Sequence, residues 1–126
     1  MGIPRFGRVQ LKIMHVLWEK GRASAREITQ TLSLSEPIAH STVQTLLRKL
    51  ETKGSIRHEA QDRTFMFFPV VRKEKVKRGA VHDLMERVFG GSAAELVAYL
   101  FQHENIPPEE MQQICKLINR KSQKEG

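Results

Sequence analysis

The sequence contains a single cysteine, Cys115, among its 126 residues. One thiol per chain excludes an intrachain disulfide framework, and it also excludes a zinc finger or a copper site built from a cysteine cluster. We interpret Cys115 as a small apolar residue within a helix. A chain that does without disulfides fits a reducing setting, so the sequence predicts a cytoplasmic protein.

Long apolar runs are also missing. No stretch approaches the roughly 18 consecutive apolar residues that a membrane-spanning helix requires. Charged residues interrupt the apolar ones throughout residues 1–15, which is not the pattern of a signal peptide. The sequence therefore predicts a chain that is not inserted into a membrane.

Motifs for catalysis and for metal binding are absent as well. The five histidines show neither the H-x-x-x-H nor the H-E-x-x-H spacing of metal sites. No glycine-rich phosphate loop is present, because Gly90 and Gly91 are placed to end a helix, and nothing marks a nucleophile elbow. We therefore predict that the protein is not an enzyme and that it binds no metal and no cofactor.

Acidic residues are outnumbered by basic ones. The chain has 21 Lys and Arg against 14 Asp and Glu, which gives a formal net charge of +7. This excess implies an electrostatic preference for a polyanion, either nucleic acid or an anionic membrane surface. The length corresponds to one domain, or to a small domain with an appendage.

Apolar spacing predicts three helices before residue 54. The first covers residues 9–20, is apolar around much of its circumference and ends at a glycine. The second begins at Ser24, which forms a capping box with Glu27, and runs to residue 33. The third covers residues 40–54 and carries its leucines and valine at helical spacing.

The spacing shortens after Gly54. Residues 55–60 and 64–70 are rich in β-formers and flank a polar tip, which predicts a two-stranded hairpin that ends at Pro69. Three helices followed by such a wing is the order of a winged helix-turn-helix. We predict a mainly α fold with a small β wing: a winged-helix DNA-binding domain in residues 1–70 and a helical dimerisation domain in residues 71–126.

The helix predicted for residues 40–54 has a second face that is polar, short and cationic. An α-helix fits the major groove of B-DNA, where such side chains match the donors and acceptors of base edges and phosphates. The N-terminus of the preceding helix would then bind a phosphate of the DNA backbone, and the wing tip would bind a second phosphate. The predicted DNA-binding residues are Ser41, Thr42, Gln44, Thr45, Arg48 and Lys49 on this helix, Ser24 and Arg26 on the preceding one, and Arg57, His58 and Arg63 at the wing tip.

Three further amphipathic helices are predicted in residues 71–126, and they leave little room for a core between them. We therefore expect them to pair with a second copy of the chain, although packing back onto the wing domain remains an alternative. The predicted dimerisation residues are Val76, Ala80, Leu84, Val88, Leu96, Val97, Leu100, Phe101, Met111, Ile114, Leu117 and Ile118.

The runs FGRVQLKIMHVLWEKGRASAREI and STVQTLLRKLETKG, with FGGSAAELVAYL further on, resemble the penicillinase repressor family (BlaI/MecI/CopY type) over nearly the whole chain. The resemblance implies a homodimeric transcriptional repressor on a palindromic operator in double-stranded DNA. It also implies that Ser41, Thr42, Gln44, Thr45 and Lys49 occupy recognition positions. The family often has arginine where Lys49 stands; lysine keeps a phosphate contact without the bidentate geometry.

The family implies two release mechanisms, and neither match is complete. One branch works through a membrane sensor peptidase and cleavage of an Asn-Phe bond, whose place is taken here by Tyr99-Leu100. The copper-responsive branch uses a C-terminal cysteine cluster, and this chain has Cys115 alone. Two other functions stay open: a winged-helix interaction module for a protein or a structured RNA, and an architectural DNA binder without base readout.

Overall fold

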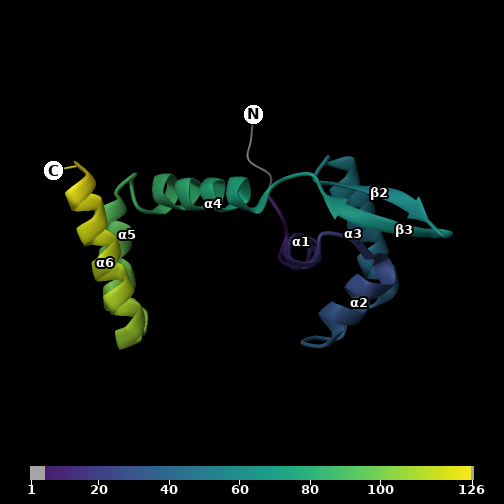
Figure 1. Cartoon of the computed structure of the whole chain (residues 1–126), viewed down its shortest axis with the longest axis horizontal. Coiled ribbons are helices and arrows are strands. Elements are labelled where there is room, and N and C mark those ends of the chain that lie inside the picture. Colours follow the sequence, from purple (N-terminus) through teal and green to yellow (C-terminus); the bar gives the residue numbers. More distant parts are fainter. Residues whose placement is uncertain (1–4, 126) are drawn as a thin grey trace. The chain divides into compact units, whose positions relative to one another are not determined.

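The computed structural model describes residues 5–125. Most of its secondary structure is helical (Figure 1). The described residues form two compact units, which meet between Val81 and His82. The elements are α1 (Arg8–Lys20), β1 (Ala23–Ser24), α2 (Ala25–Ser33), α3 (His40–Thr52), β2 (Ile56–Gln61), β3 (Thr64–Pro69), α4 (Lys73–Val88), α5 (Ala93–His103) and α6 (Pro108–Glu125).

The hydrophobic core lies in the first unit, where α1, α2 and α3 pack together with the start of β2. Ile13, Leu17, Leu47, Leu50 and Ile56 are almost completely buried there. Each such side chain contributes about 1.5–3 kcal/mol when it leaves water. The predicted fold class, mainly helical with a small β wing, is confirmed by this arrangement.

The sheet has one strand more than the sequence predicted. Its order is β1-β3-β2, and the added strand β1 pairs Ala23 with Phe67 and Ser24 with Met66. The hairpin itself was predicted correctly, and its two-residue turn, Asp62 and Arg63, has positive φ angles of 48° and 68°. A turn with two positive φ angles matches the right-handed twist of a hairpin.

Local signals in the sequence account for the helix ends. Gly21 follows α1 with a φ of 84°, a conformation in which glycine carries no steric penalty. The predicted capping box at the start of α2 is present, because the Ser24 hydroxyl accepts a hydrogen bond from the Glu27 backbone N–H. The Glu27 carboxylate in turn accepts from the Ser24 N–H.

The segment after the wing is tied back to α1. The indole Nε1 of Trp18 donates a 2.9 Å hydrogen bond to the backbone carbonyl of Val71. Val71 and Trp18 also pack against the buried core. The beginning of the linker to α4 is therefore held by the first unit.

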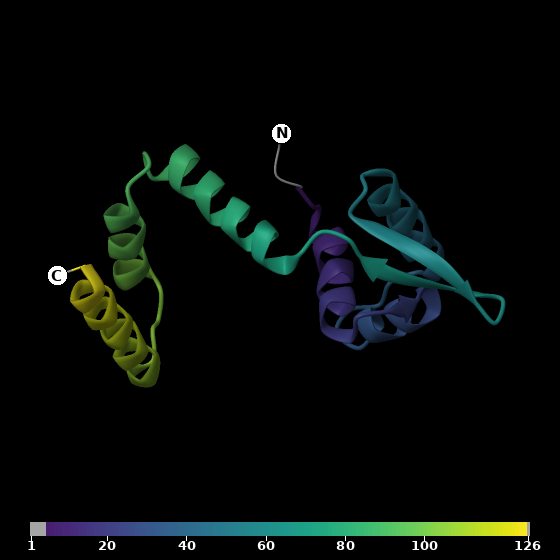
Figure 2. The same cartoon turned by 45° about the horizontal axis from the view of Figure 1, so that its top comes forward.

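In the second unit, α5 and α6 lie side by side (Figures 1 and 2). The Ser92 hydroxyl caps the start of α5, since it accepts a hydrogen bond from the Glu95 backbone N–H at 3.1 Å. Of the twelve residues predicted for dimerisation, Val76, Leu96 and Ile114 are half-buried and the other nine are exposed. Among the described residues, no helix is long and apolar enough to cross a membrane.

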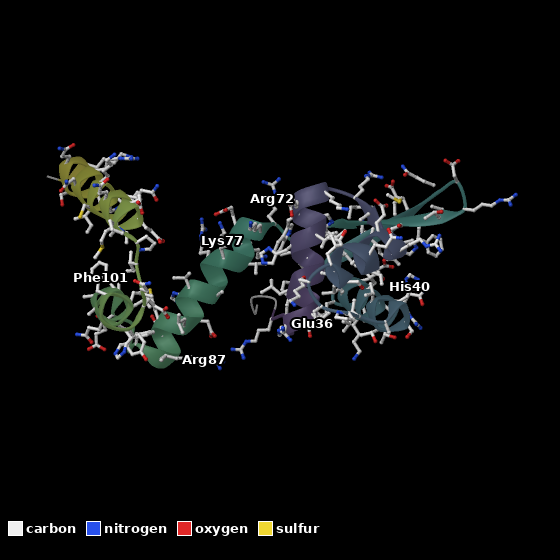
Figure 3. The ribbon with its side chains drawn as sticks, turned by 90° about the horizontal axis from the view of Figure 1, so that it is seen from below. Glu36, His40, Arg72, Lys77, Arg87 and Phe101 are labelled. Carbon is white, nitrogen blue, oxygen red and sulfur yellow. The ribbon has the colours of Figure 1, made fainter. Side chains whose placement is uncertain are left out.

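An ion cluster joins α1 to the turn between α2 and α3. Glu36 is labelled in Figure 3. Its carboxylate lies 3.0 Å from the Arg8 guanidinium and 3.3 Å from the Lys12 ammonium. The hydrogen bond from Lys12, with the charge of Arg8, holds the pKa of the Glu36 carboxyl below its ordinary value of 4.5. Both cations therefore favour the ionised carboxylate in the folded chain.

We expect Glu36→Gln to lower the resistance to urea at pH 7 and to have no effect at pH 2. The pKa is depressed on folding, so this stabilisation is present above pH 4.5 and is lost as the pH falls through the lower folded value. Urea unfolding followed by circular dichroism at both pH values measures the difference. Glu19→Gln, at an exposed position of α1, is the matched control. An equal difference at both pH values would contradict the electrostatic origin.

Candidate nucleic-acid interface

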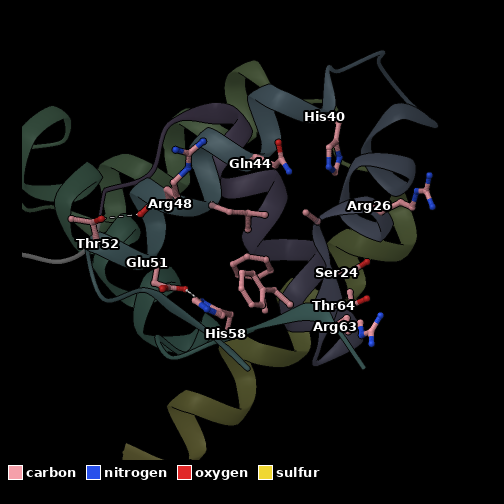
Figure 4. A pocket seen from close by; sticks show the side chains of 14 residues that line it. Ser24, Arg26, His40, Gln44, Arg48, Glu51, Thr52, His58, Arg63 and Thr64 are labelled. Carbon is pink, nitrogen blue, oxygen red and sulfur yellow. Dashed lines mark hydrogen bonds and ion pairs between the residues drawn. The ribbon is translucent and has the colours of Figure 1, made fainter. Parts of the chain in front are cut away.

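An open groove of about 1000 Å³ lies between α3 and the wing. Leu47 and Phe67 contribute apolar side chains to its lining. The side chains labelled in Figure 4 are polar, and several of them are cationic. The groove is lined by Ser24, Ala25, Arg26, His40, Gln44, Leu47, Arg48, Glu51, Thr52, His58, Arg63, Thr64, Phe65 and Phe67.

Helix α3 positions its polar residues because its apolar side is fixed in the core. Val43, Leu47 and Leu50 are buried, which turns the opposite side of the helix outward. All six of the predicted recognition residues on α3 are exposed: Ser41, Thr42, Gln44, Thr45, Arg48 and Lys49.

The exposed side of α3 has two edges. His40, Gln44 and Arg48 follow each other at four-residue steps and line the groove. Ser41 and Thr45 lie on the neighbouring edge, where the Thr45 hydroxyl donates to the Ser41 carbonyl at 3.0 Å. With its hydrogen used in this way, the Thr45 hydroxyl is left as an acceptor.

The two predicted residues on α2 have different surroundings. Arg26 is exposed in the first turn of the helix and lines the groove (Figure 4). Ser24 is only 9% exposed, and its hydroxyl is engaged in the helix cap. The cap role of Ser24 is therefore structural, and the phosphate contact expected of it stays a prediction.

The wing carries Arg63 at its tip, but the other two residues predicted there lie elsewhere. Arg57 and His58 are near the start of β2, opposite Phe68 and Phe67, so their placement at the tip was wrong. The strands remain paired as far as Gln61 and Thr64, so the tip consists of Asp62 and Arg63.

His58 faces the groove and joins the wing to α3. Its Nδ1 donates a 2.6 Å hydrogen bond to the Glu51 carboxylate, which can only accept when ionised. The imidazole also packs against Phe65, with ring centroids 4.5 Å apart. Arg57 points to the other face of the hairpin, since side chains alternate along a strand. A DNA contact of either residue stays a prediction.

The charges around the groove are mostly positive. The guanidinium groups of Arg26, Arg48 and Arg63 stand at its rim, and Glu51, paired with His58, is the only carboxylate in its lining. Guanidinium groups bind phosphate oxygens through paired hydrogen bonds. The groove therefore suits a polyanion whose edges also offer hydrogen-bond donors and acceptors.

The sequence did not predict several residues that line this groove, among them Phe65, Glu51 and His40. Phe65 is 57% exposed although it is aromatic, and Glu51 on α3 accepts a hydrogen bond from His58. His40 was missed because it precedes the apolar stripe, yet its position four residues before Gln44 was a usable signal.

Three helices and a wing that frame an outward-facing α3 define a winged helix-turn-helix protein. The chain belongs to the penicillinase repressor family, whose model matches residues 6–120. The penicillinase repressor of Bacillus licheniformis is 23% identical over 96% of this chain and 98% of that protein. The methicillin resistance regulatory protein MecI of Staphylococcus aureus (strain N315) is 23% identical over 87% of this chain and 89% of that protein. The resemblance predicted from the motifs is confirmed.

Solved structures agree with this family. The DNA-binding domain of the repressor BlaI is 28% identical and matches with a TM-score of 0.53, over 60% of this chain and 93% of that one. A MarR mutant from E. coli, solved with operator DNA, is 13% identical and matches with a TM-score of 0.54 over 91% of this chain and 74% of that one. The second likeness shows the fold alone. Members of the family are repressors, so the prediction that the chain is not an enzyme is confirmed.

We expect Ser24→Ala to lower the free energy of unfolding by about 1 kcal/mol, because the first turn of α2 loses its side-chain cap. Urea unfolding followed by circular dichroism measures this loss. Ser33→Ala, at the exposed last residue of α2, makes the same chemical change without removing a cap. Equal stability of the two variants would show that the cap bond contributes nothing.

Proposed function

We propose that the protein is a sequence-specific transcriptional repressor that binds a palindromic operator in double-stranded DNA as a homodimer. The observation that carries the proposal is the exposed polar side of α3 beside an open, arginine-rimmed groove. A helix held in this way can enter the major groove, where base edges present distinct patterns of donors and acceptors.

The parts of the site divide the work of binding DNA. Gln44 and its neighbours on α3 are placed to read base edges, since an amide side chain pairs with the N6 and N7 atoms of adenine. Arg26 on α2 and Arg63 at the wing tip flank α3 and are placed to bind phosphates. Phosphate contacts supply affinity and register, while base contacts supply the choice of sequence.

The homodimer is supported by the apolar surface of the second unit. Val88, Leu117 and Ile118 are each more than half exposed, and α5 buries no residue at all. Large apolar side chains left exposed in this way are typical of an interaction site. A second copy would offer the same surface, and a two-fold axis would set two α3 helices on half-sites about 34–36 Å apart or a multiple of that spacing.

Release through a membrane sensor peptidase remains a prediction from the family. The bond that corresponds in position, Tyr99-Leu100, lies within α5, and both side chains are partly exposed. Tyr99 packs against the His103 ring, with centroids 4.2 Å apart.

We expect Gln44→Ala to relax the choice of sequence and Arg63→Ala to weaken binding to every sequence alike. Loss of a bidentate base contact reduces discrimination at one base pair by about 1–3 kcal/mol, whereas loss of one phosphate contact lowers the salt slope by about 1. Fluorescence anisotropy measures both, with a palindrome selected from random duplexes and a scrambled duplex, at several salt concentrations.

The same titrations separate the two alternative functions. Equal losses on selected and scrambled DNA for Gln44→Ala would contradict its base-reading role. An interaction module for protein or RNA would show no affinity for either duplex, and an architectural binder would bind both equally.

We expect Leu117→Asp to shift the protein from dimer to monomer and to weaken palindrome binding at least tenfold, because a charge would be buried in the apolar interface. Asn119→Asp adds the same charge two residues further along α6, away from the apolar stripe, and serves as the control. Sedimentation equilibrium gives the mass of each variant. If the wild-type chain were monomeric and still bound the palindrome tightly, the proposal of a homodimer would be wrong.

A further inference from the structure

His40 is the first residue of α3 and begins the groove-lining edge that continues with Gln44 and Arg48 (Figure 4). Its side chain is exposed, and its Nδ1 atom lies 3.0 Å from the hydroxyl oxygen of Thr29 on α2. The ring is therefore held by the helix that precedes it in the motif.

The hydrogens at Thr29 determine which ring nitrogen of His40 carries the proton. The Thr29 hydroxyl is 2.8 Å from the Ala25 carbonyl, which has no hydrogen to give, so the hydroxyl donates there. A hydroxyl has a single hydrogen. Both contacts exist together only if His40 donates from Nδ1 to the Thr29 oxygen.

This tautomer leaves Nε2 as the functional atom of the ring. In a neutral imidazole with a proton on Nδ1, Nε2 is a hydrogen-bond acceptor. Within residues 5–125, this atom has no hydrogen-bond partner. An acceptor thus stands at the start of α3, on the edge that lines the groove, and it is fixed in direction by the bond at Nδ1.

We propose that His40 reads a base edge, with its Nε2 atom accepting a hydrogen bond from the exocyclic amine of an adenine or a cytosine in the major groove. These amines are the donors that the major groove presents, and the N-terminal residues of a recognition helix are those that contact bases. The inference rests on the proposed function and adds a specificity-determining residue to it. Thr29 is the positioning residue, because its oxygen fixes the tautomer and the direction of the ring.

Two substitutions separate base reading from a merely structural link between α2 and α3. His40→Asn keeps an N–H close to the position of Nδ1, so the bond to Thr29 is retained while the acceptor at Nε2 is lost. His40→Gln does the reverse, since its amide oxygen reaches the place of Nε2. Both are exposed changes at the end of a helix, and circular dichroism confirms that each variant is folded.

The experiment uses the full chain at pH 8. The operator is first selected from random duplexes with the wild-type chain, and dissociation constants are then measured for every single base-pair replacement within it. We expect His40→Asn to lose discrimination threefold to tenfold at one A·T or C·G pair of each half-site, the effect of one hydrogen bond. We expect His40→Gln to retain a preference at that pair, and both variants to bind random duplex within twofold of wild type.

Two results would overturn the inference while leaving the proposed function intact. In one, His40→Asn shows the wild-type preference at every position, which would make His40 a structural link alone. In the other, it loses affinity equally for the operator and for random duplex, which would make His40 a phosphate contact. If the wild-type chain selects no sequence at all, the proposed function fails as well, so the two failures are distinguishable.

Discussion

The interface depends on one constraint, the burial of a single side of α3. Val43, Leu47 and Leu50 are fixed in the core, and a helix that is fixed on one side has no freedom to rotate. The direction of every polar side chain on the other side follows from this packing. Other contacts in the first unit also help to hold α3 and the wing in position. The capping box fixes the start of α2, the ion cluster at Glu36 holds the turn before α3, and β1 pairs with β3 of the wing.

The wing is coupled to α3 by direct side-chain contacts. His58 on β2 binds Glu51 on α3, and the rings of Phe65 and Phe67 on β3 pack against His58. The two elements that border the groove, α3 and the wing, are therefore linked to each other by side-chain contacts. Arg63 lies in the tight turn at the end of the hairpin. Because α3 and the wing are already held together, less conformational entropy would be lost if both were to bind one duplex.

The sequence predicted the elements that have a period and missed those that do not. Helical spacing located the first three helices to within a few residues and predicted the three others within residues 71–126, and alternating β-formers located the hairpin. The strand β1 has two residues, Ala23 and Ser24, and two residues show no periodicity. The fold class also followed from the order of the elements, because few arrangements bury three short helices and a hairpin.

The site was predictable only in part, for a physical reason. The polar side of α3 could be found from its spacing, but which edge of it borders the groove depends on where the wing packs. That packing turns His40 and Gln44 toward the groove and leaves Ser41 and Thr45 beside it. His58 was predicted at the wing tip because it is polar. In the structure it contacts Glu51 on α3 and Phe65 on β3.

The hydrogen bond between Trp18 and Val71 gives the molecule a built-in optical reporter. The chain has one tryptophan, and its indole is bound to the first residues that leave the wing for α4. Detachment of that segment would expose the indole N–H to water and shift the emission to the red. Tryptophan fluorescence therefore reports on this junction without any label.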